Sequence, residues 1–281
     1  MRISARSIAV AGIAFAVGSL IAGALVLYTG AYDVAATQPH WRLTNWLLHT
    51  ELHQSVARQA RNVHAPPLDD TAFIERGLAL YRGNCVPCHG APGIAPDAFA
   101  LGLLPPPANL ALTAREWLPA ELYWVVRHGV KATGMPAWAY RLSDPDLWAI
   151  VAFLRRLPDL SPVDYAERVR LHPETPAAGL SNPRASEGPG DAGRGKLALS
   201  QYACITCHVI PGVPGTYAPV GPPLGRMATR AFIAGVLRNT PENMVRWLRE
   251  PQKIVPRTAM PALGVTDQDA RDIAAYLETL E

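Results

Sequence analysis

Apolar residues fill the first part of the chain. No charged residue occurs from Ser7 to Tyr32, a run of 26 residues made mostly of Ala, Val, Ile, Leu and Gly. A helix needs only ~20 apolar residues to cross the core of a bilayer. Arg2 and Arg6 precede the run, and Asp33 is the first charge after it. The positive-inside rule therefore places the N-terminus in the cytoplasm and the rest of the chain outside it.

Two interpretations of this run place the bulk of the chain in the same compartment. We expect residues 1–32 to form a cytoplasmic stub and an uncleaved transmembrane anchor. The alternative is a cleaved signal peptide, for which Val34-Ala35-Ala36 offers a small-residue site. The apolar region of a signal peptide is only about 7–15 residues long. We expect a single-pass protein of the bacterial inner membrane, with its folded part on the periplasmic side.

Residues 33–68 are expected to form a connector and a juxtamembrane helix. Between His40 and Arg61, apolar residues recur at the spacing of one helical face. Tryptophans close to a membrane span favour an interfacial helix. A helix packed on the next domain, or on the membrane subunit of a partner, is an alternative that the sequence does not decide. The apolar positions are Trp41, Leu43, Trp46, Leu47, Leu48, Leu52 and Val56.

Two copies of one sequence unit follow. Cys85-Val86-Pro87-Cys88-His89 recurs as Cys204-Ile205-Thr206-Cys207-His208, 119 residues later. In each copy an Arg-Gly pair precedes the motif, and a Pro-rich loop, a Met-Pro-Ala sequence and a capped apolar helix follow it. The matching features are Arg76-Gly77 and Arg194-Gly195, Pro105–Pro107 and Pro222–Pro223, Met135–Ala137 and Met260–Ala262, and the stretches Ser143–Leu157 and Thr266–Leu280.

The repeat sets the expected domain boundaries. One domain is predicted over residues 69–160 and a second over residues 192–281. Between them, Pro158–Gly190 lacks apolar periodicity and carries scattered Pro, Gly and Ser. We therefore interpret residues 161–191 as a linker.

All four cysteines of the chain lie in the two Cys-x-x-Cys-His motifs. This is the attachment motif of a c-type haem, in which the cysteines form thioethers with the porphyrin and the histidine becomes the proximal iron ligand. A zinc site would place its two Cys pairs roughly 15–20 residues apart. A thiol redox pair or an ordinary disulfide needs no histidine at the fifth position. We expect two covalently bound haem c groups, held by Cys85, Cys88 and His89 and by Cys204, Cys207 and His208.

The second axial ligand of each iron is expected to be a methionine. Met135 and Met260 each begin a Met-Pro pair, where proline favours an extended loop that can present a thioether to the iron. A buried methionine that fills a gap is the alternative. Met244 lies in a helical pattern and is expected in the core, and Met227 follows His208 too closely to be the preferred ligand. The predicted iron ligands are therefore His89, Met135, His208 and Met260.

With these motifs in this order, twice, the chain resembles the class I c-type cytochromes over Thr71–Leu157 and Gly193–Leu280. The resemblance implies an all-α fold, with two tandem cytochrome c domains after the N-terminal transmembrane helix. It implies that a Pro-rich-loop carbonyl accepts the N–H of each ligating histidine, near Pro106-Pro107 and Pro222-Pro223. It also makes Trp124, Trp247 and Arg226 candidates to bind haem propionates, with core packing as the alternative for both tryptophans.

The charge pattern fits a redox protein. Charged residues are 17 % of the chain and the net charge is +3, which argues against a nucleic-acid binder with a basic patch. Seven basic residues fall between Arg226 and Arg257, against only Glu242 and Glu250. They form either a solvated face that neutralises propionates or a docking face for an acidic redox partner.

These features predict a membrane-anchored dihaem cytochrome that transfers electrons in a bacterial respiratory chain. It is either a free anchored carrier or the cytochrome subunit of an oxidoreductase or terminal oxidase, and its plan is similar to the dihaem third subunit of C-family haem–copper oxidases. Its expected partners are a dehydrogenase or quinol-oxidising donor and a terminal oxidase acceptor, with no small-molecule substrate and no catalytic residue of its own. The alternative is a dihaem enzyme, either a peroxidase or a thiosulfate-oxidising cytochrome.

Overall fold

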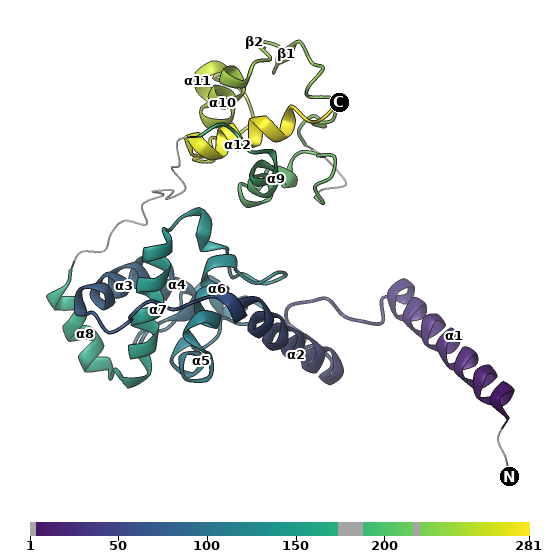
Figure 1. The fold of residues 1–281 in the computed structure, drawn as a ribbon, viewed down its shortest axis with the longest axis vertical. Coiled ribbons are helices and arrows are strands. Elements are labelled where there is room, and N and C mark those ends of the chain that lie inside the picture. The colour runs from purple at the N-terminus through teal and green to yellow at the C-terminus, as the bar shows by residue number, and fades with distance from the viewer. Residues whose placement is uncertain (1–3, 174–187, 216–219) are drawn as a thin grey trace.

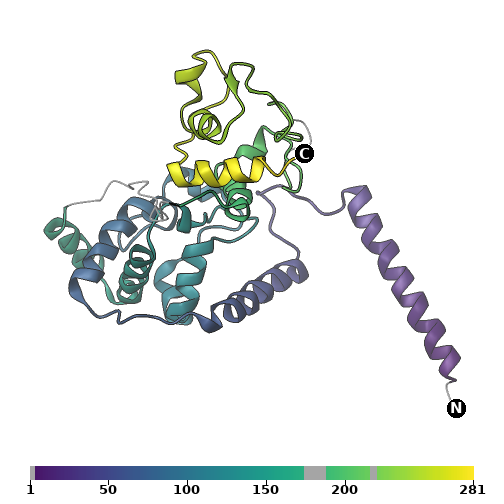
Figure 2. The same ribbon diagram turned by 45° about the horizontal axis from the view of Figure 1, so that its top comes forward.

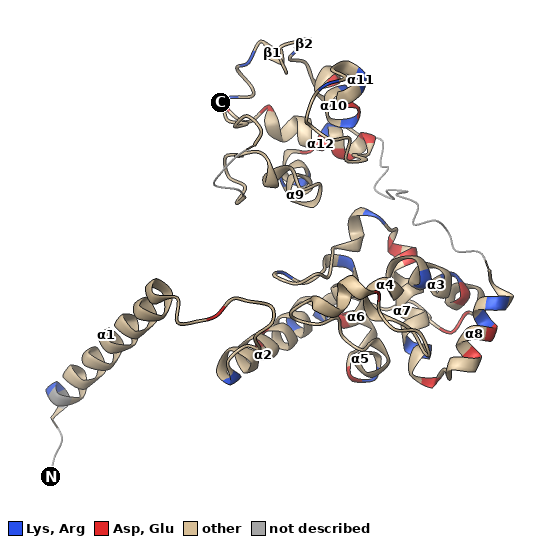
Figure 3. Cartoon of the chain, turned by 180° about the vertical axis from the view of Figure 1, so that it is seen from behind, with Lys and Arg blue, Asp and Glu red and all other residues tan. Residues whose placement is uncertain are grey.

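A long apolar helix begins the chain. The computed structural model describes residues 4–173, 188–215 and 220–281. Helix α1 (Ala5–Thr29) contains a stretch, Ile8–Thr29, that is long and apolar enough to cross a membrane, with a mean hydropathy of 2.4 and no buried residue. The helix stands apart from the rest of the chain (Figure 1). Figure 3 shows charge only at its N-terminal end.

The first domain is built around one helix crossing. Its N-terminal helix packs on its last long helix, and the shorter elements close around the pair. Asp70 and Ser143 cap the two helices by accepting hydrogen bonds from Phe73 N and Asp146 N. The cap at Ser143 is the one that the sequence pattern predicts. The elements are α3 (Thr71–Asn84), α4 (Val86–His89), η2 (Ala98–Gly102), α5 (Leu110–Glu116), α6 (Pro119–His128), η3 (Trp138–Tyr140), α7 (Asp144–Arg156) and η4 (Leu157–Asp159).

A glycine makes this crossing close. A Cβ on Gly77 of α3 would lie 1.9 Å from the carbonyl oxygen of Ala149 in α7. Only a residue without a side chain allows the two backbones to approach so far. Around the contact, Tyr81 packs on Phe153 with ring centroids 5.2 Å apart.

Part of the segment interpreted as a linker is helical. Helix α8 (Pro162–Leu171) follows η4 and returns to the first domain. A capping box between Ser161 and Asp164 starts it, Tyr165 is fully buried in the first core, and Arg168 pairs with Glu75 of α3 at 2.5 Å. A single buried anchor gives little apolar periodicity, which is why the pattern suggested a linker. Residues 174–187 of that segment lie outside the described part of the chain.

The second domain repeats the crossing. Helix α9 packs on α12, and a Cβ on Gly195 would lie 1.9 Å from the Asp272 carbonyl oxygen. Thr266 caps α12 by accepting from Asp269 N. This domain also has a short β-hairpin, whose strands β1 and β2 have two residues each. The described residues of the first domain contain no such hairpin. The elements are α9 (Ala192–Gln201), η5 (Cys204–Thr206), β1 (Phe232–Ile233), β2 (Leu237–Arg238), α10 (Pro241–Arg249), α11 (Pro251–Ile254) and α12 (Asp267–Leu277).

The predicted fold class is confirmed: the chain is mostly helical, with an N-terminal apolar helix and two repeated helical units. The second domain lies beside the first in both ribbon views (Figures 1 and 2). The guanidinium of Arg141 from the first domain lies over the Tyr202 ring of the second, 5.1 Å from its centroid.

Candidate haem-binding sites

An apolar pocket in the first domain gathers the predicted ligands. Cys85, Cys88, His89 and Met135 all line it, although Met135 lies 46 residues beyond His89 in the chain. The volume is about 490 Å³, within the range of about 300–1,000 Å³ typical of cofactor sites. Apolar side chains close its walls, among them Leu52, Trp117, Leu122, Trp138, Ile150 and Leu154.

His89 is held in the orientation of an axial ligand. It ends the short helix α4, and its Nδ1 donates to the carbonyl of Ala108, 2.8 Å away. That bond leaves Nε2 as the free ring nitrogen, and such a partner fixes the tautomer and orientation of a ligating histidine. Burial lowers the pKa of His89, against the opposing effect of the Ala108 bond. A neutral imidazole is the form that binds a metal.

Met135 is presented by a braced loop. Its backbone N–H donates to Thr133 Oγ1 at 3.0 Å, and its carbonyl accepts from Val130 N at 3.2 Å. Gly129 ends α6 with a φ of 65°, and a Cβ there would lie 2.6 Å from the Met135 carbonyl oxygen. The loop can therefore turn back tightly enough to bring the thioether to the pocket.

The second domain repeats the hydrogen bonds that hold the histidine and the methionine loop. His208 Nδ1 donates to the Pro222 carbonyl at 2.7 Å, and the Gly221 N–H donates to the Cys207 carbonyl at 2.9 Å. A Cβ on Gly221 would lie 2.5 Å from His208 Cε1, so the loop passes directly against the imidazole. Met260 is braced like Met135, by bonds from its N–H to Thr258 Oγ1 and from Gln252 Nε2 to its carbonyl.

The first cysteine of each motif lacks the low pKa of a redox-active thiol. Burial, and then the charge of Cys88, raises the pKa of Cys85 to about 12. Burial is also the largest cause that raises the pKa of Cys204 to about 11. Redox-active Cys-x-x-Cys pairs have the opposite property, a thiol pKa of ≈ 3.5–7.5. In each motif the first thiol is therefore held protonated close to a fixed imidazole, a donor set that fits a covalently attached haem.

Met244 is buried in the second core, as expected, and is only 5 % exposed. Met227 is equally buried there, and Trp247 packs in the same core, which is one of the two roles considered for it. In the first domain the histidine-bonding carbonyl is that of Ala108, one residue after Pro107; in the second it is that of Pro222 itself.

Other residues differ from the sequence reading. The Trp124 ring is tilted against that of His128, with ring centroids 5.0 Å apart, and Trp124 is not among the residues that line the first pocket. Trp117 and Trp138 do line it and were not singled out. The place of Trp138, three residues after Met135, was the available signal. Leu52 comes from α2 (Arg42–Gln59), far from either motif. The apolar spacing placed it on a helical face, but it did not decide whether that face packs on the first domain.

Much of the basic segment of the second domain is locally paired. Arg249 bonds to Asp267 at 2.8 Å and Lys253 to Glu250 at 2.6 Å. Arg230 donates to the carbonyls of Pro223 and Gly225 at 2.5 and 2.9 Å. Figure 3 shows both acidic (red) and basic (blue) positions on the ribbon around α10 and α12. Several basic side chains of this segment therefore already have partners within the domain. This pairing weakens the interpretation of the segment as a docking face.

Comparison with known families covers both domains. Residues 72–154 match the family described as cytochrome c oxidase, cbb3-type, subunit III, and residues 192–281 match the cytochrome c family. Cytochrome c2 of Rhodopila globiformis is 36 % identical over 105 residues, which cover 33 % of this chain and 96 % of that protein.

Two larger relatives match only in part. Cytochrome c oxidase subunit 2 of Alkalihalophilus pseudofirmus is 35 % identical over 91 residues, or 32 % of this chain and 26 % of that protein. Dihydro-heme d1 dehydrogenase of Pseudomonas aeruginosa is 33 % identical over 116 residues, or 40 % of this chain and 22 % of that protein. The chain thus spans about a quarter of each of these two proteins. Both family models match, and part of the chain is similar to nearly the full length of cytochrome c2. The chain therefore belongs to the cytochrome c family, with two cytochrome c domains in tandem that bind haem c and transfer electrons.

Proposed function

We propose that this chain is a dihaem c-type cytochrome anchored in the inner membrane by α1, with domains over residues 69–160 and 192–281 on the periplasmic side. The observation that carries the proposal is the repeated site. In each domain a Cys-x-x-Cys-His histidine has its Nδ1 bonded to a loop carbonyl, and a hydrogen-bonded Met-Pro loop lies later in the chain. One copy alone would suit a simple carrier; two suit electron transfer between haems.

Each set of residues has a distinct task. The haem would supply reversible one-electron chemistry. Cys85 and Cys88, or Cys204 and Cys207, would fix the cofactor covalently. His89 and Met135, or His208 and Met260, would be the ligands that hold the iron. The apolar wall around the first site would limit the access of water to the haem, and that low polarity helps to set its reduction potential.

The proposed setting is a bacterial respiratory chain. A quinol-oxidising complex or a dehydrogenase would be the donor, and a terminal oxidase the acceptor. Both large relatives are named as parts of redox systems, and the first domain matches an oxidase-subunit family. These likenesses favour a subunit of such a complex or a carrier that serves one.

Haem content and ligation test the proposal. The purified chain should contain two haems that survive denaturation, and the double variant Cys85→Ser/Cys88→Ser should contain one. The oxidised protein should show the ~695 nm band of Met–iron ligation, reduced in Met135→Ala and in Met260→Ala but unchanged in the core control Met244→Leu. A high-spin haem with peroxidase turnover would instead identify a dihaem enzyme. Release of the chain from membranes by carbonate would refute the anchor.

A further inference from the structure

Helix α2 has two parts with different surroundings. Its C-terminal part is seated on the first domain: Val56 is 1 % exposed, and the His53 ring lies 4.7 Å from that of Trp117. Leu52 reaches the wall of the first pocket. The N-terminal part carries large apolar side chains with no such seat. Trp41, Leu43, Trp46 and Leu47 are 50 %, 65 %, 60 % and 51 % exposed.

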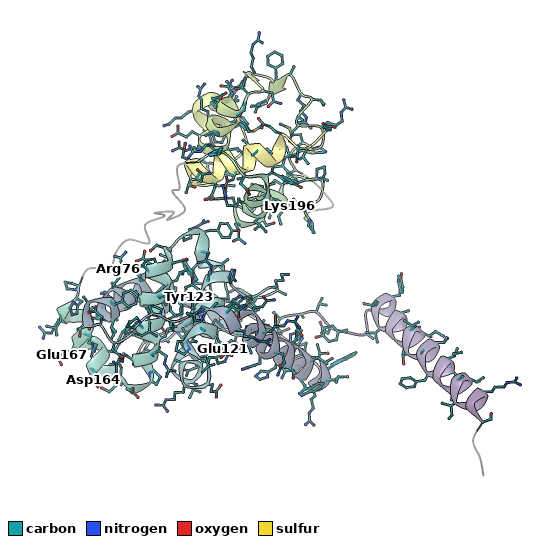
Figure 4. All side chains as sticks on the ribbon, viewed as in Figure 1. Arg76, Glu121, Tyr123, Asp164, Glu167 and Lys196 are labelled. Atoms are coloured by element: carbon teal, nitrogen blue, oxygen red, sulfur yellow. The ribbon has the colours of Figure 1, made fainter. Side chains whose placement is uncertain are left out.

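These exposed side chains form a surface rather than a scatter. Leu43, Trp46 and Leu47 are spaced i, i+3 and i+4, so they share one face of α2. At 3.6 residues per turn, that face points roughly a third of a turn away from Val56. The domain therefore does not cover it, and Figure 4 shows side chains projecting from α2 into open space. We call Trp41, Leu43, Trp46 and Leu47 the α2 apolar surface.

The chain itself places this surface close to the end of α1. The Tyr32 ring packs edge-on against Trp41, with centroids 5.0 Å apart, and its hydroxyl contacts the His40 ring. Tyr32 lies three residues after Thr29, the last residue of α1. Three residues span at most about 11 Å. The contacts therefore fold the connector back and hold the start of α2 beside the end of the apolar helix.

We propose that the α2 apolar surface lies in the interfacial layer of the lipid bilayer. The proposal rests on the proposed function, because α1 must be the membrane anchor. Tryptophan and tyrosine favour the headgroup level, where an apolar ring and a polar edge are both satisfied. An amphipathic helix lies in that layer with its apolar face towards the acyl chains. Arg42, at the start of α2, stands where anionic headgroups would attract it.

The consequence for the first haem site is positional. One rigid helix carries the membrane-facing surface at its start and a pocket-wall residue, Leu52, about two turns later. Docking α2 on the bilayer would therefore fix the height and orientation of the first domain above the membrane. The second domain, joined through residues outside the described part of the chain, would not be fixed by this contact.

Depth measurements on the full chain test this. The four native cysteines are consumed by haem attachment, so Leu43→Cys or Leu47→Cys offers one thiol for an environment-sensitive fluorophore. The labelled protein is placed in nanodiscs of phosphatidylethanolamine and phosphatidylglycerol. Quenching by a nitroxide on the lipid chains is compared with quenching by aqueous iodide. Leu20→Cys in α1 and Leu112→Cys, an exposed leucine of α5, serve as lipid and water references.

We expect labels at positions 43 and 47 to be quenched several-fold more by the lipid nitroxide than the label at position 112. Trp46→Gln should weaken that quenching at position 43, whereas Leu48→Gln, on the other side of α2, should not. The inference would be overturned if iodide quenched the labels at positions 43 and 47 as strongly as the label at 112, while the label at position 20 was still quenched by the lipid nitroxide. Shielding from both quenchers would mean that a protein covers the surface, which also overturns it. Loss of lipid quenching at position 20 would instead refute the anchor itself.

Discussion

The two cytochrome c domains cross their first and last helices through a glycine, yet they surround the crossing with different chemistry. In the first domain the ion pair near the crossing, between Arg76 and Asp146 at 3.0 Å, lies at the surface. In the second, Asp272 is 1 % exposed and binds Arg194 Nε and Nη2 at 2.7 and 2.8 Å. The close backbone approach is common to both domains, so it does not depend on which side chains flank it.

The surroundings of the buried carboxylate explain why it is tolerated. Besides Arg194, Asp272 accepts hydrogen bonds from the Asp191 N–H at 2.8 Å and from Gln268 Nε2 at 2.9 Å. A buried charge is stable only when such partners replace its lost water. The second domain therefore uses a polar clamp where the first uses packed rings and aliphatic side chains. The comparison predicts equal sensitivity to the glycine and unequal sensitivity to the carboxylate.

The largest effect is expected from the glycines. In Gly77→Ala or Gly195→Ala the new methyl group would meet a backbone carbonyl at 1.9 Å, and the helices must separate. Overpacking of this kind costs roughly 3 kcal/mol, confined to the domain that carries the change. Calorimetry of the haem-loaded chain should show one transition lowered and the other unchanged. Gly102→Ala, where a Cβ meets nothing within 4 Å, is the control. Equal stability of all three variants would contradict the close approach.

A smaller, pH-dependent effect is expected from the buried carboxylate. Burial tends to raise the pKa of Asp272, but its bonds to Arg194, Asp191 and Gln268 outweigh burial and leave the pKa below the ordinary 3.8. Its stabilisation is then fully present above the unfolded pKa and is lost as the pH falls through the lower, folded value. Asp272→Asn should lower the stability of the second domain by about 2 kcal/mol at neutral pH.

The matching change in the first domain sharpens the contrast. Asp146→Asn weakens a surface pair and should cost less than about 1 kcal/mol. Denaturant unfolding across a pH series measures both. The difference in unfolding free energy between the parent chain and Asp272→Asn should vanish as the pH falls below 3.8. The difference for Asp146→Asn should be small at every pH. If Asp272→Asn lowers the unfolding free energy equally down to strong acid, the stabilisation by Asp272 does not depend on its negative charge.

The sequence predicted the parts of this comparison that depend on local pattern. The capped helices after Ser143 and Thr266, the core position of Met244 and the repeated motif all follow from short-range spacing. Helix α8 was missed because one buried side chain, Tyr165, holds it, although the capping box from Ser161 to Asp164 was visible in the sequence.

The walls of the first pocket could not be predicted in the same way. Leu52, Trp117 and Trp138 come from three separate segments and meet only after α2 has docked on the domain. The polar clamp of the second domain was equally hidden. Arg194 and Asp272 are 78 residues apart. The equivalent arginine of the first domain, Arg76, pairs with Asp146, which lies one helical turn earlier in its helix than the position that corresponds to Asp272. Side-chain partners across a crossing depend on the rotation of each helix, which apolar spacing fixes only approximately.

The smallest effect is expected where the two domains touch. Arg141 lies over the Tyr202 ring at 5.1 Å, a cation–π geometry worth about 0.5–1 kcal/mol. Tyr202 also donates to Asp269 Oδ2 at 2.7 Å, so a change at Tyr202 alone mixes the contact between domains with one inside the second domain. A double-mutant cycle separates them: Arg141→Ala and Tyr202→Leu should couple by that amount in unfolding of the second domain. Additivity in the Arg141–Tyr202 cycle would mean that this contact does not couple the unfolding of the two domains. The linker would then be their main connection.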